Sequence, residues 1–188
     1  MSIFKSNLEA LRSLLEDVRS LDDRVLAAGR LASDTLLNGG KIFFCGNGGS
    51  AADSQHLAAE LTGRFVNDRR PLSAIALSTD TSALTCIGND YSFDEIFARQ
   101  VAGLGRNGDL LIGISTSGNS RNVIRAVEEA KKVGIKTIGL LGRNGGKLHS
   151  LCDQSIVVPH GVTARIQECH ILIGHTLCGL IEENLGLV

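Results

Sequence analysis

The sequence has no excess of charge of either sign. Its 188 residues include 19 Lys and Arg against 20 Asp and Glu, which gives a formal net charge of -1 at pH 7. No basic stripe stands out along the chain. Nucleic acids and anionic membranes attract proteins through an excess of positive charge. The composition therefore gives no electrostatic reason to expect binding to a nucleic acid or an anionic membrane.

Paired cysteine motifs are also missing. The five cysteines are odd in number, form no Cys-x-x-Cys pair and lie mostly within apolar runs. These features argue against a disulfide framework and predict reduced thiols in the core. The residues concerned are Cys45, Cys86, Cys152, Cys169 and Cys178.

Long apolar runs are absent as well. No stretch could span a bilayer, and residues 1–20 mix acidic and basic side chains without an apolar signal core. There is no internal repeat, low-complexity tract or linker, and 43% hydrophobic residues suffice for one sizeable core. We therefore expect a cytoplasmic protein with one domain over residues 1–188, made of N-terminal helices (1–38) and an α/β core (41–188).

Apolar strand patterns alternate with helical patterns after residue 40. Two helices are predicted first, over 3–18 and 25–37, and a glycine stop follows them at residues 38–40. Strands are predicted over 41–45, 73–77, 110–114, 137–141 and 154–158, with helices near 51–65, 81–88, 93–104, 120–133 and 146–151. This order indicates an α/β fold: a three-layer, doubly wound, five-stranded parallel sheet. Ligands of such sheets bind beyond the carboxyl ends of the strands.

The last predicted helix, over about 164–184, has almost no polar face. Its apolar residues lie on nearly all sides: Ile166, Ile171, Leu172, Ile173, Leu177, Leu180 and Ile181. A helix that is apolar on most sides is usually buried. We therefore predict a long buried C-terminal helix that packs in a multi-helix interface between subunits.

Hydroxyl side chains gather between the predicted strand 110–114 and the predicted helix 120–133. This serine loop reads Ser115-Thr116-Ser117-Gly118-Asn119-Ser120. The first N–H groups of a helix lack partners and lie at the positive end of its dipole, so they can bind an anion. One serine would suffice to cap the helix. Four hydroxyl residues within six favour a phosphate-binding loop.

A second strand ends in a glycine loop, Gly46-Asn47-Gly48-Gly49-Ser50. Its glycines do not fit the Rossmann pattern G-x-G-x-x-G, and neither loop has the lysine spacing of a Walker motif. Arg121 is the only cation directly beside either loop. Two loops without lysine suit a single phosphate bound by dipoles and hydroxyl groups, and this favours a sugar phosphate.

Two groups of polar residues have the composition of a metal site. His56 and Glu60 lie four residues apart, about 6 Å along one face of a helix. The last helix adds Gln167, His170 and His175, and polar groups in such an apolar helix must find partners. We expect one of His170 and His175 to be a core histidine whose hydrogen bonds are made within the protein. Gln167 and His175 would stand about 12 Å apart along the helix, so a shared ion must lie between them.

Several segments, taken together and in order, closely resemble the phosphoheptose isomerases, a family of sugar isomerase (SIS) domain enzymes. They are Cys45–Asp53, Gln55–Arg64, Ile87–Asp90, Gly113–Ser120 and Arg165–His170 with His175. The resemblance implies conversion of sedoheptulose 7-phosphate to D-glycero-D-manno-heptose 7-phosphate, the first step towards ADP-heptose and the lipopolysaccharide core. It also implies a homotetramer with active sites at subunit interfaces and one Zn²⁺ per subunit.

The resemblance assigns roles to particular positions. The implied zinc ligands are His56, Glu60, Gln167 and His175, which leaves His170 outside the metal site. The implied substrate contacts are Asn47, Gly48, Gly49, Ser50, Glu60, Asn89, Asp90, Ser115, Thr116, Ser117, Ser120 and Gln167. One departure is Ala164, where some members carry an acidic residue that touches the sugar.

The residue types suit an aldose–ketose isomerisation. The reaction moves a proton between C1 and C2 of the open-chain sugar through an enediol and needs both a base and an acid. We expect Glu60 to be the base and His175 the partner acid or base. If both side chains instead coordinate zinc, neither is a free catalyst, and the metal would hold the hydroxyls or polarise the carbonyl. Two other functions fit the same fold: a non-catalytic SIS tetramer that binds a replication-initiator protein, and an isomerase or sensor of another sugar phosphate.

Overall fold

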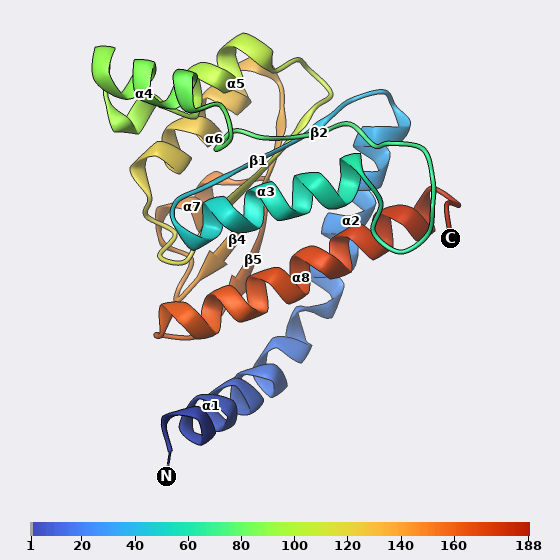
Figure 1. The fold of residues 1–188 in the computed structure, drawn as a ribbon, viewed down its shortest axis with the longest axis vertical. Helices are drawn as coiled ribbons and strands as arrows, with labels where there is room; N and C mark the ends of the chain where they lie inside the picture. Colours follow the sequence, from blue (N-terminus) through green and yellow to red (C-terminus); the bar gives the residue numbers. More distant parts are fainter. Residues whose placement is uncertain (1) are drawn as a thin grey trace.

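The structure, a computed structural model, describes residues 2–188 and contains one five-stranded sheet (Figure 1). The strands are β1 (Ile42–Gly46), β2 (Ala74–Ala76), β3 (Leu110–Ser115), β4 (Lys136–Gly142) and β5 (Gln154–Val158). They lie in the order β2-β1-β3-β4-β5, and every neighbouring pair is parallel. The predicted α/β fold with a doubly wound parallel sheet is confirmed.

The helices follow the predicted order with shifted ends. They are α1 (Ile3–Val18), α2 (Asp22–Leu37), α3 (Gly49–Thr62), α4 (Thr81–Asp90), α5 (Ala98–Leu104), α6 (Arg121–Val133), α7 (Gly146–Leu151) and α8 (Thr163–Asn184), with 3₁₀ turns η1 (Arg19–Leu21) and η2 (Phe93–Glu95). The helix predicted over 93–104 is interrupted, because η2 is separate from α5. The helix predicted over 51–65 ends at Thr62, since Gly63 follows it with an irregular backbone.

Successive strand residues point to opposite faces of the sheet, so each face has its own core. Ile42 and Phe44 of β1 belong to a cluster with residues of α2, α3 and α8. Phe43 and Cys45 of the same strand belong to a cluster with residues of α5, α6 and α7. The three layers are therefore helices, sheet and helices.

Helix α8 lies along the sheet beside α2 and α3 (Figure 1). Its core-facing side is buried, including Ile166, Ile173 and Ile181. Leu172, on the other side, is 48% exposed. The chain itself therefore buries one side of this helix, as predicted. The apolar residues on the other side remain exposed and could contact another subunit.

The prediction that all cysteines are core thiols is wrong for Cys86, which is exposed on α4. Cys45, Cys169 and Cys178 are buried, and none of the five forms a disulfide within residues 2–188. Burial raises the pKa of the Cys178 thiol to about 12, which keeps this group protonated at neutral pH.

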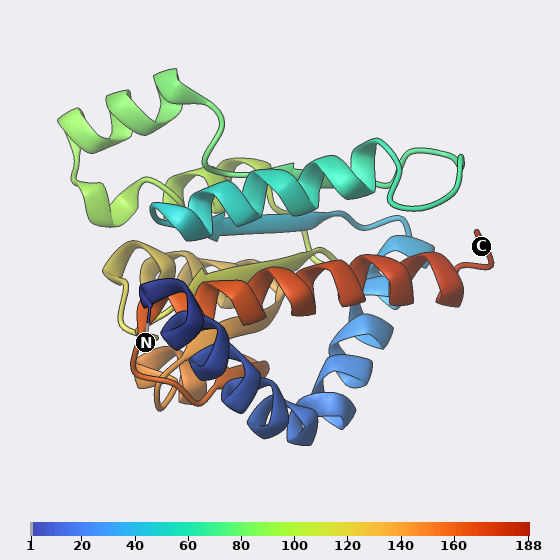
Figure 2. The same ribbon diagram turned by 60° about the horizontal axis from the view of Figure 1, so that its bottom comes forward.

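Helices α1 and α4 stand away from the layers (Figure 1). Helix α1 meets α2 at an angle (Figure 2) and reaches beyond the body of the molecule (Figure 1). Leu14 is the one buried residue of α1, and α4 has none. Within residues 2–188, no helix is both long and apolar enough to cross a membrane.

Candidate active site

The glycine loop and the serine loop lie side by side at the carboxyl edge of the sheet. They follow β1 and β3, which pair directly with Gly46 opposite Ile114. The side-chain amides of Asn47 and Asn122 join them through two reciprocal hydrogen bonds of 2.9 and 2.8 Å. One ligand could therefore contact both loops, as predicted.

The serine loop is folded around its hydroxyl groups. The hydroxyls of Ser115 and Ser120 lie 2.9 Å apart, and the backbone N–H of Asn119 donates to Ser117 Oγ. Ser120 occupies the N-cap position of α6, but its side chain makes no capping hydrogen bond. Ser120 therefore does not serve as a helix cap through its side chain. The N–H groups at the start of α6 remain suited to binding an anion.

Glycine is required at one point of this loop. Gly118 has φ of +66°, a conformation that side chains rarely adopt, and a Cβ atom there would collide with the carbonyl of Gly145. The serine loop is thus held closely against the turn before α7.

His56, Glu60 and His175 form a compact group between α3 and α8. His56 Nε2 lies 2.9 Å from Glu60 Oε1 and 3.3 Å from His175 Nε2. The two imidazole rings meet at 65° with centroids 5.0 Å apart. One ligand atom from each residue lies within 4.8 Å of the others, so the three could hold one metal ion.

The donor set and its surroundings fit a divalent cation. Two imidazole nitrogens and one carboxylate oxygen are ligands typical of zinc. Asp53, one turn before His56 on α3, has a buried carboxylate oxygen without a hydrogen-bond partner in the described part of the chain. Burial raises the pKa of Asp53, whereas the charges of His56 and His175 lower it. The group thus has a further carboxylate within electrostatic reach.

Comparisons with known proteins agree with this geometry. The family model described as "SIS domain" matches residues 7–142. The chain is 59% identical over 182 residues to the phosphoheptose isomerase of a Nitratiruptor species, and the match covers 97% of each chain. The structure of phosphoheptose isomerase GmhA from Neisseria gonorrhoeae superimposes with a TM-score of 0.92 at 48% identity, over 96% of this chain and 97% of that one. This chain belongs to the phosphoheptose isomerase family.

A second solved structure extends the match. The phosphoheptose isomerase from Francisella tularensis gives a TM-score of 0.93 at 40% identity, and the match covers 96% of each chain. Because the similarity spans nearly the whole chain, the family assignment applies to the sheet, both loops and α8.

The fourth ligand predicted for this member of the phosphoheptose isomerase family, Gln167, contacts the first residue of α3. Its amide packs against Gly49, where no Cβ atom would fit. Gly49 begins α3, about two turns before His56. Gln167 therefore lies beside the glycine loop, which suits its predicted substrate contact, and its role as a metal ligand stays a prediction.

His170 is buried away from the group. Its Nε2 lies 2.9 Å from the carbonyl oxygen of Leu141, and its Nδ1 has no hydrogen-bond partner among the described residues. Burial lowers the pKa of His170 to about 4, and the contact with the Leu141 carbonyl only partly offsets this. His170 is thus a neutral core histidine.

Asn89 and Asp90 end α4 on the outside of the subunit. Asn89 donates to Asp90, and Cys86 Sγ lies 3.4 Å from the other Asp90 oxygen. Neither side chain has a hydrogen bond to the serine loop or to His56, Glu60 and His175 within residues 2–188. The single chain therefore does not bring these two predicted substrate contacts to the rest of the site.

Two residues that shape the site, Asn122 and Phe65, are not among those predicted from the sequence. Asn122 holds Asn47, and a signal existed, since Asn122 is the second residue of α6 and lies two positions after the serine loop. Phe65 packs against the His175 ring with centroids 5.6 Å apart and planes tilted by 31°. No sequence signal could have indicated this pair, because Phe65 follows α3 in an irregular segment.

Proposed function

We propose that this protein interconverts sedoheptulose 7-phosphate and D-glycero-D-manno-heptose 7-phosphate. The observation that carries the proposal is the meeting of Glu60 and His175, which are the acid–base pair expected from the sequence, beside loops suited to one phosphate. Family membership supports the same activity. A non-catalytic SIS protein that binds a replication initiator has no need for this pair.

The phosphate is proposed to bind the serine loop. Ser115, Ser117 and Ser120 supply hydroxyl donors, and the start of α6 supplies N–H groups and the positive end of a helix dipole. The open-chain sugar then extends along the glycine loop, and Gln167 packs against that loop at Gly49. This orientation would carry C1 and C2 of the sugar towards Glu60 and His175.

Glu60 is the proposed base. Its side chain contacts His56 through Oε1, which leaves Oε2 to accept the proton from one sugar carbon and return it to the next. His175 is the proposed partner that, through the ring nitrogen not bound to the metal, gives a proton to the oxygen of the old carbonyl and accepts one from the other hydroxyl. This proton transfer would reduce the negative charge that develops on the enediol oxygens.

We infer that Zn²⁺ is held by His56, Glu60 and His175, with Gln167 as the predicted fourth ligand. A bound zinc ion would supply a Lewis acid for the sugar oxygens. The chain's own contribution is to fix the three grouped ligand atoms from two helices that are far apart in the sequence.

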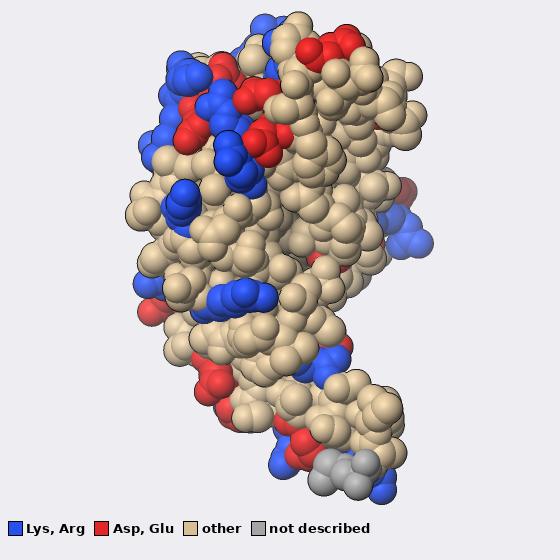
Figure 3. Space-filling view, turned by 90° about the vertical axis from the view of Figure 1, so that its left-hand side faces the viewer, with Lys and Arg blue, Asp and Glu red and all other residues tan. Residues whose placement is uncertain are grey.

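We also infer a homotetramer with active sites at subunit interfaces. Helix α1 protrudes as an arm (Figure 3), and Ile3, Phe4 and Leu8 on it are 82%, 74% and 51% exposed. Exposed apolar surface of this extent favours association. Asn89 and Asp90 lie on the outside of α4, where a neighbouring subunit could complete the site around them.

We further propose one SIS domain over residues 1–188 and action in the cytoplasm at the first step towards ADP-heptose. Strand β5 and helix α8 lie beyond residues 7–142 of the family match, yet β5 pairs with β4 and α8 covers the same sheet face as α3. The five unpaired cysteines agree with a reducing compartment.

Incubation of the purified protein with sedoheptulose 7-phosphate, followed by NMR, tests the activity. The anomeric signals of the aldose product should appear with the wild-type protein and stay at background with Glu60→Gln. A ketose phosphate of different chain length serves as the specificity control. Binding of the heptulose without any aldose product would instead identify a sugar-phosphate sensor.

A further inference from the structure

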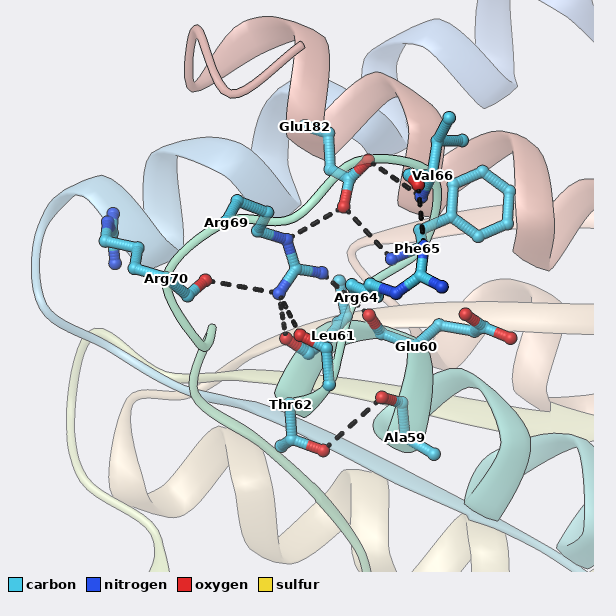
Figure 4. A network of polar contacts seen from close by, with 11 residues as sticks. Ala59, Glu60, Leu61, Thr62, Arg64, Phe65, Val66, Arg69, Arg70 and Glu182 are labelled. Carbon is cyan, nitrogen blue, oxygen red and sulfur yellow. Dashed lines mark hydrogen bonds and ion pairs between the residues drawn. The ribbon is translucent and has the colours of Figure 1, made fainter.

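A buried ion pair joins the loop after α3 to α8 (Figure 4). Arg69 Nε donates to Glu182 Oε1 at 2.8 Å, and the two side chains are only 2% and 0% exposed. Neither residue belongs to the proposed catalytic, metal or substrate contacts. Replacing a buried ion pair with apolar side chains often leaves stability unchanged or improved, so stability alone explains this pair poorly.

Arg69 closes the C-terminal end of α3. The last carbonyl groups of a helix lack partners, and a guanidinium both satisfies them and lies favourably at the negative end of the dipole. Its terminal nitrogens donate to four carbonyl oxygens, those of Glu60, Leu61, Gly63 and Arg70, at 2.7, 2.8, 2.9 and 3.2 Å. Arg69 therefore holds the backbone of Glu60 itself.

Glu182 holds the beginning of the loop after α3. Besides Arg69, its carboxylate accepts hydrogen bonds from the backbone N–H groups of Phe65 at 3.2 Å and Val66 at 3.4 Å. The ring of Phe65 in turn packs against His175. Glu182 follows His175 by seven residues and so lies about two turns further along the same side of α8.

The pair thus reaches both halves of the metal-binding group. One partner fixes the end of α3, which carries His56 and Glu60, and the other fixes the residue that lies against His175. We propose that Arg69 and Glu182 are positioning residues that keep the α3 ligands and the α8 ligand at the separation needed to share one metal ion. This inference rests on the proposed zinc-dependent isomerase.

Glu182→Gln tests the inference, because it keeps the size of the side chain and removes its charge. The chain offers a matched control in Asp109, a buried carboxylate that likewise accepts from two backbone N–H groups and one cation. Asp109 binds Lys41 Nζ at 2.6 Å and the backbone N–H groups of Lys41 and Arg106. This control pair lies at the opposite, amino edge of the sheet, before β1 and β3.

Zinc affinity is measured by competition with a chromogenic chelator, and kcat and KM are measured at a temperature well below both melting temperatures. Outer partners of metal ligands typically change metal affinity or activity by about 10- to 100-fold. We expect Glu182→Gln to lower both zinc affinity and kcat by about 10- to 100-fold and to change KM much less. Asp109→Asn should lower the melting temperature but leave zinc affinity and kcat within about twofold, since distant sites act independently.

Equal losses of zinc affinity in both variants, or wild-type zinc affinity and kcat in Glu182→Gln, would overturn the inference. If Glu182→Gln does not fold, Phe65→Leu replaces it, because that change keeps the ion pair and removes the ring beside His175. Unchanged zinc affinity in Phe65→Leu would then be the contrary result. A wild-type protein that binds zinc but isomerises no heptulose refutes the proposed function alone, and zinc affinity still decides the positioning role.

Discussion

At the scale of single residues, the site depends on three side chains whose ligand atoms lie within 4.8 Å of one another. Three polar side chains can lie this close either because they hydrogen-bond to one another or because they bind one ion. Substitutions can separate these roles, because loss of a catalytic residue lowers kcat and loss of a metal ligand lowers zinc content.

Glu60→Gln and His175→Asn should each lower kcat by at least about 100-fold, the loss typical of removing a general acid or base. Both substitutions keep a polar side chain no larger than the original, and neither residue is fully buried, so the proteins should remain folded. Turnover is followed by NMR and folding by circular dichroism. Retention of more than a tenth of the wild-type kcat in both variants would remove these residues from the chemistry.

His56→Ala should lower the zinc content of the purified protein, because it removes one of the three grouped ligands. His170→Gln should not, because His170 contacts the Leu141 carbonyl instead. Elemental analysis of the two variants and the wild type measures this directly. Loss of zinc from the His170 variant alone would reverse the assignment of ligand and core histidine.

His170 should also make stability depend on pH. Its pKa is lowered to about 4 in the folded protein, so the unfolded chain takes up a proton first as the pH falls. The stability held by neutral His170 is complete above about pH 6.5 and is lost between about pH 6.5 and 4. At pH 4.5 this loss should be about 2 to 3 kcal/mol.

Urea unfolding at pH 7 and pH 4.5 checks the prediction. His170→Gln keeps a donor for the Leu141 carbonyl but cannot titrate, so its free energy of unfolding should fall less between the two pH values. An identical fall in variant and wild type would show that other groups cause the acid sensitivity.

At the scale of elements, the decisive feature is the junction of β3 with α6. A serine at an N-cap normally serves its helix, yet Ser120 makes no cap hydrogen bond and instead contacts Ser115. The hydroxyl group is therefore available to a ligand at the start of the helix, where the backbone also favours an anion.

Replacing Ser117 or Ser120 with alanine should raise KM for the heptulose phosphate. A hydrogen bond to a charged group contributes about 1.5 to 3 kcal/mol, which corresponds to about 10- to 150-fold in KM. Ser33→Ala is the control, since this buried serine bonds within α2 to the Gly29 carbonyl. KM within error of the wild type in both loop variants would contradict phosphate binding by the serine loop.

At the scale of the whole molecule, apolar surface remains after the two cores are complete. Phe4 on α1 is 74% exposed and Leu172 on α8 is 48% exposed. Within one chain these side chains add nothing to the core, so their burial must come from other subunits if it occurs.

Sedimentation should therefore give a tetramer at micromolar concentration. Phe4→Glu should shift the equilibrium towards smaller species, because a charge would then be buried in the interface. Circular dichroism should stay unchanged, since Phe4 contributes little to the fold of its own chain. A wild-type monomer at this concentration would contradict the tetramer.

The sequence by itself determined the order of the elements, the parallel sheet and the two loops. These follow from local patterns: alternation of apolar strands with helices, glycine where the backbone must turn, and hydroxyl groups before a helix. The closeness of His56 and Glu60 was equally predictable, because four residues span one helical turn.

Only the tertiary structure decided what crosses between elements. It brought His175 and not His170 beside His56, which the family resemblance implied but the residue pattern left open, because the rotation of α8 about its axis depends on which apolar residues pack into the core. It also joined Asn47 to Asn122 and Arg69 to Glu182. These partners are 75 and 113 residues apart, and no local pattern specifies a contact set by the packing of whole helices against a sheet.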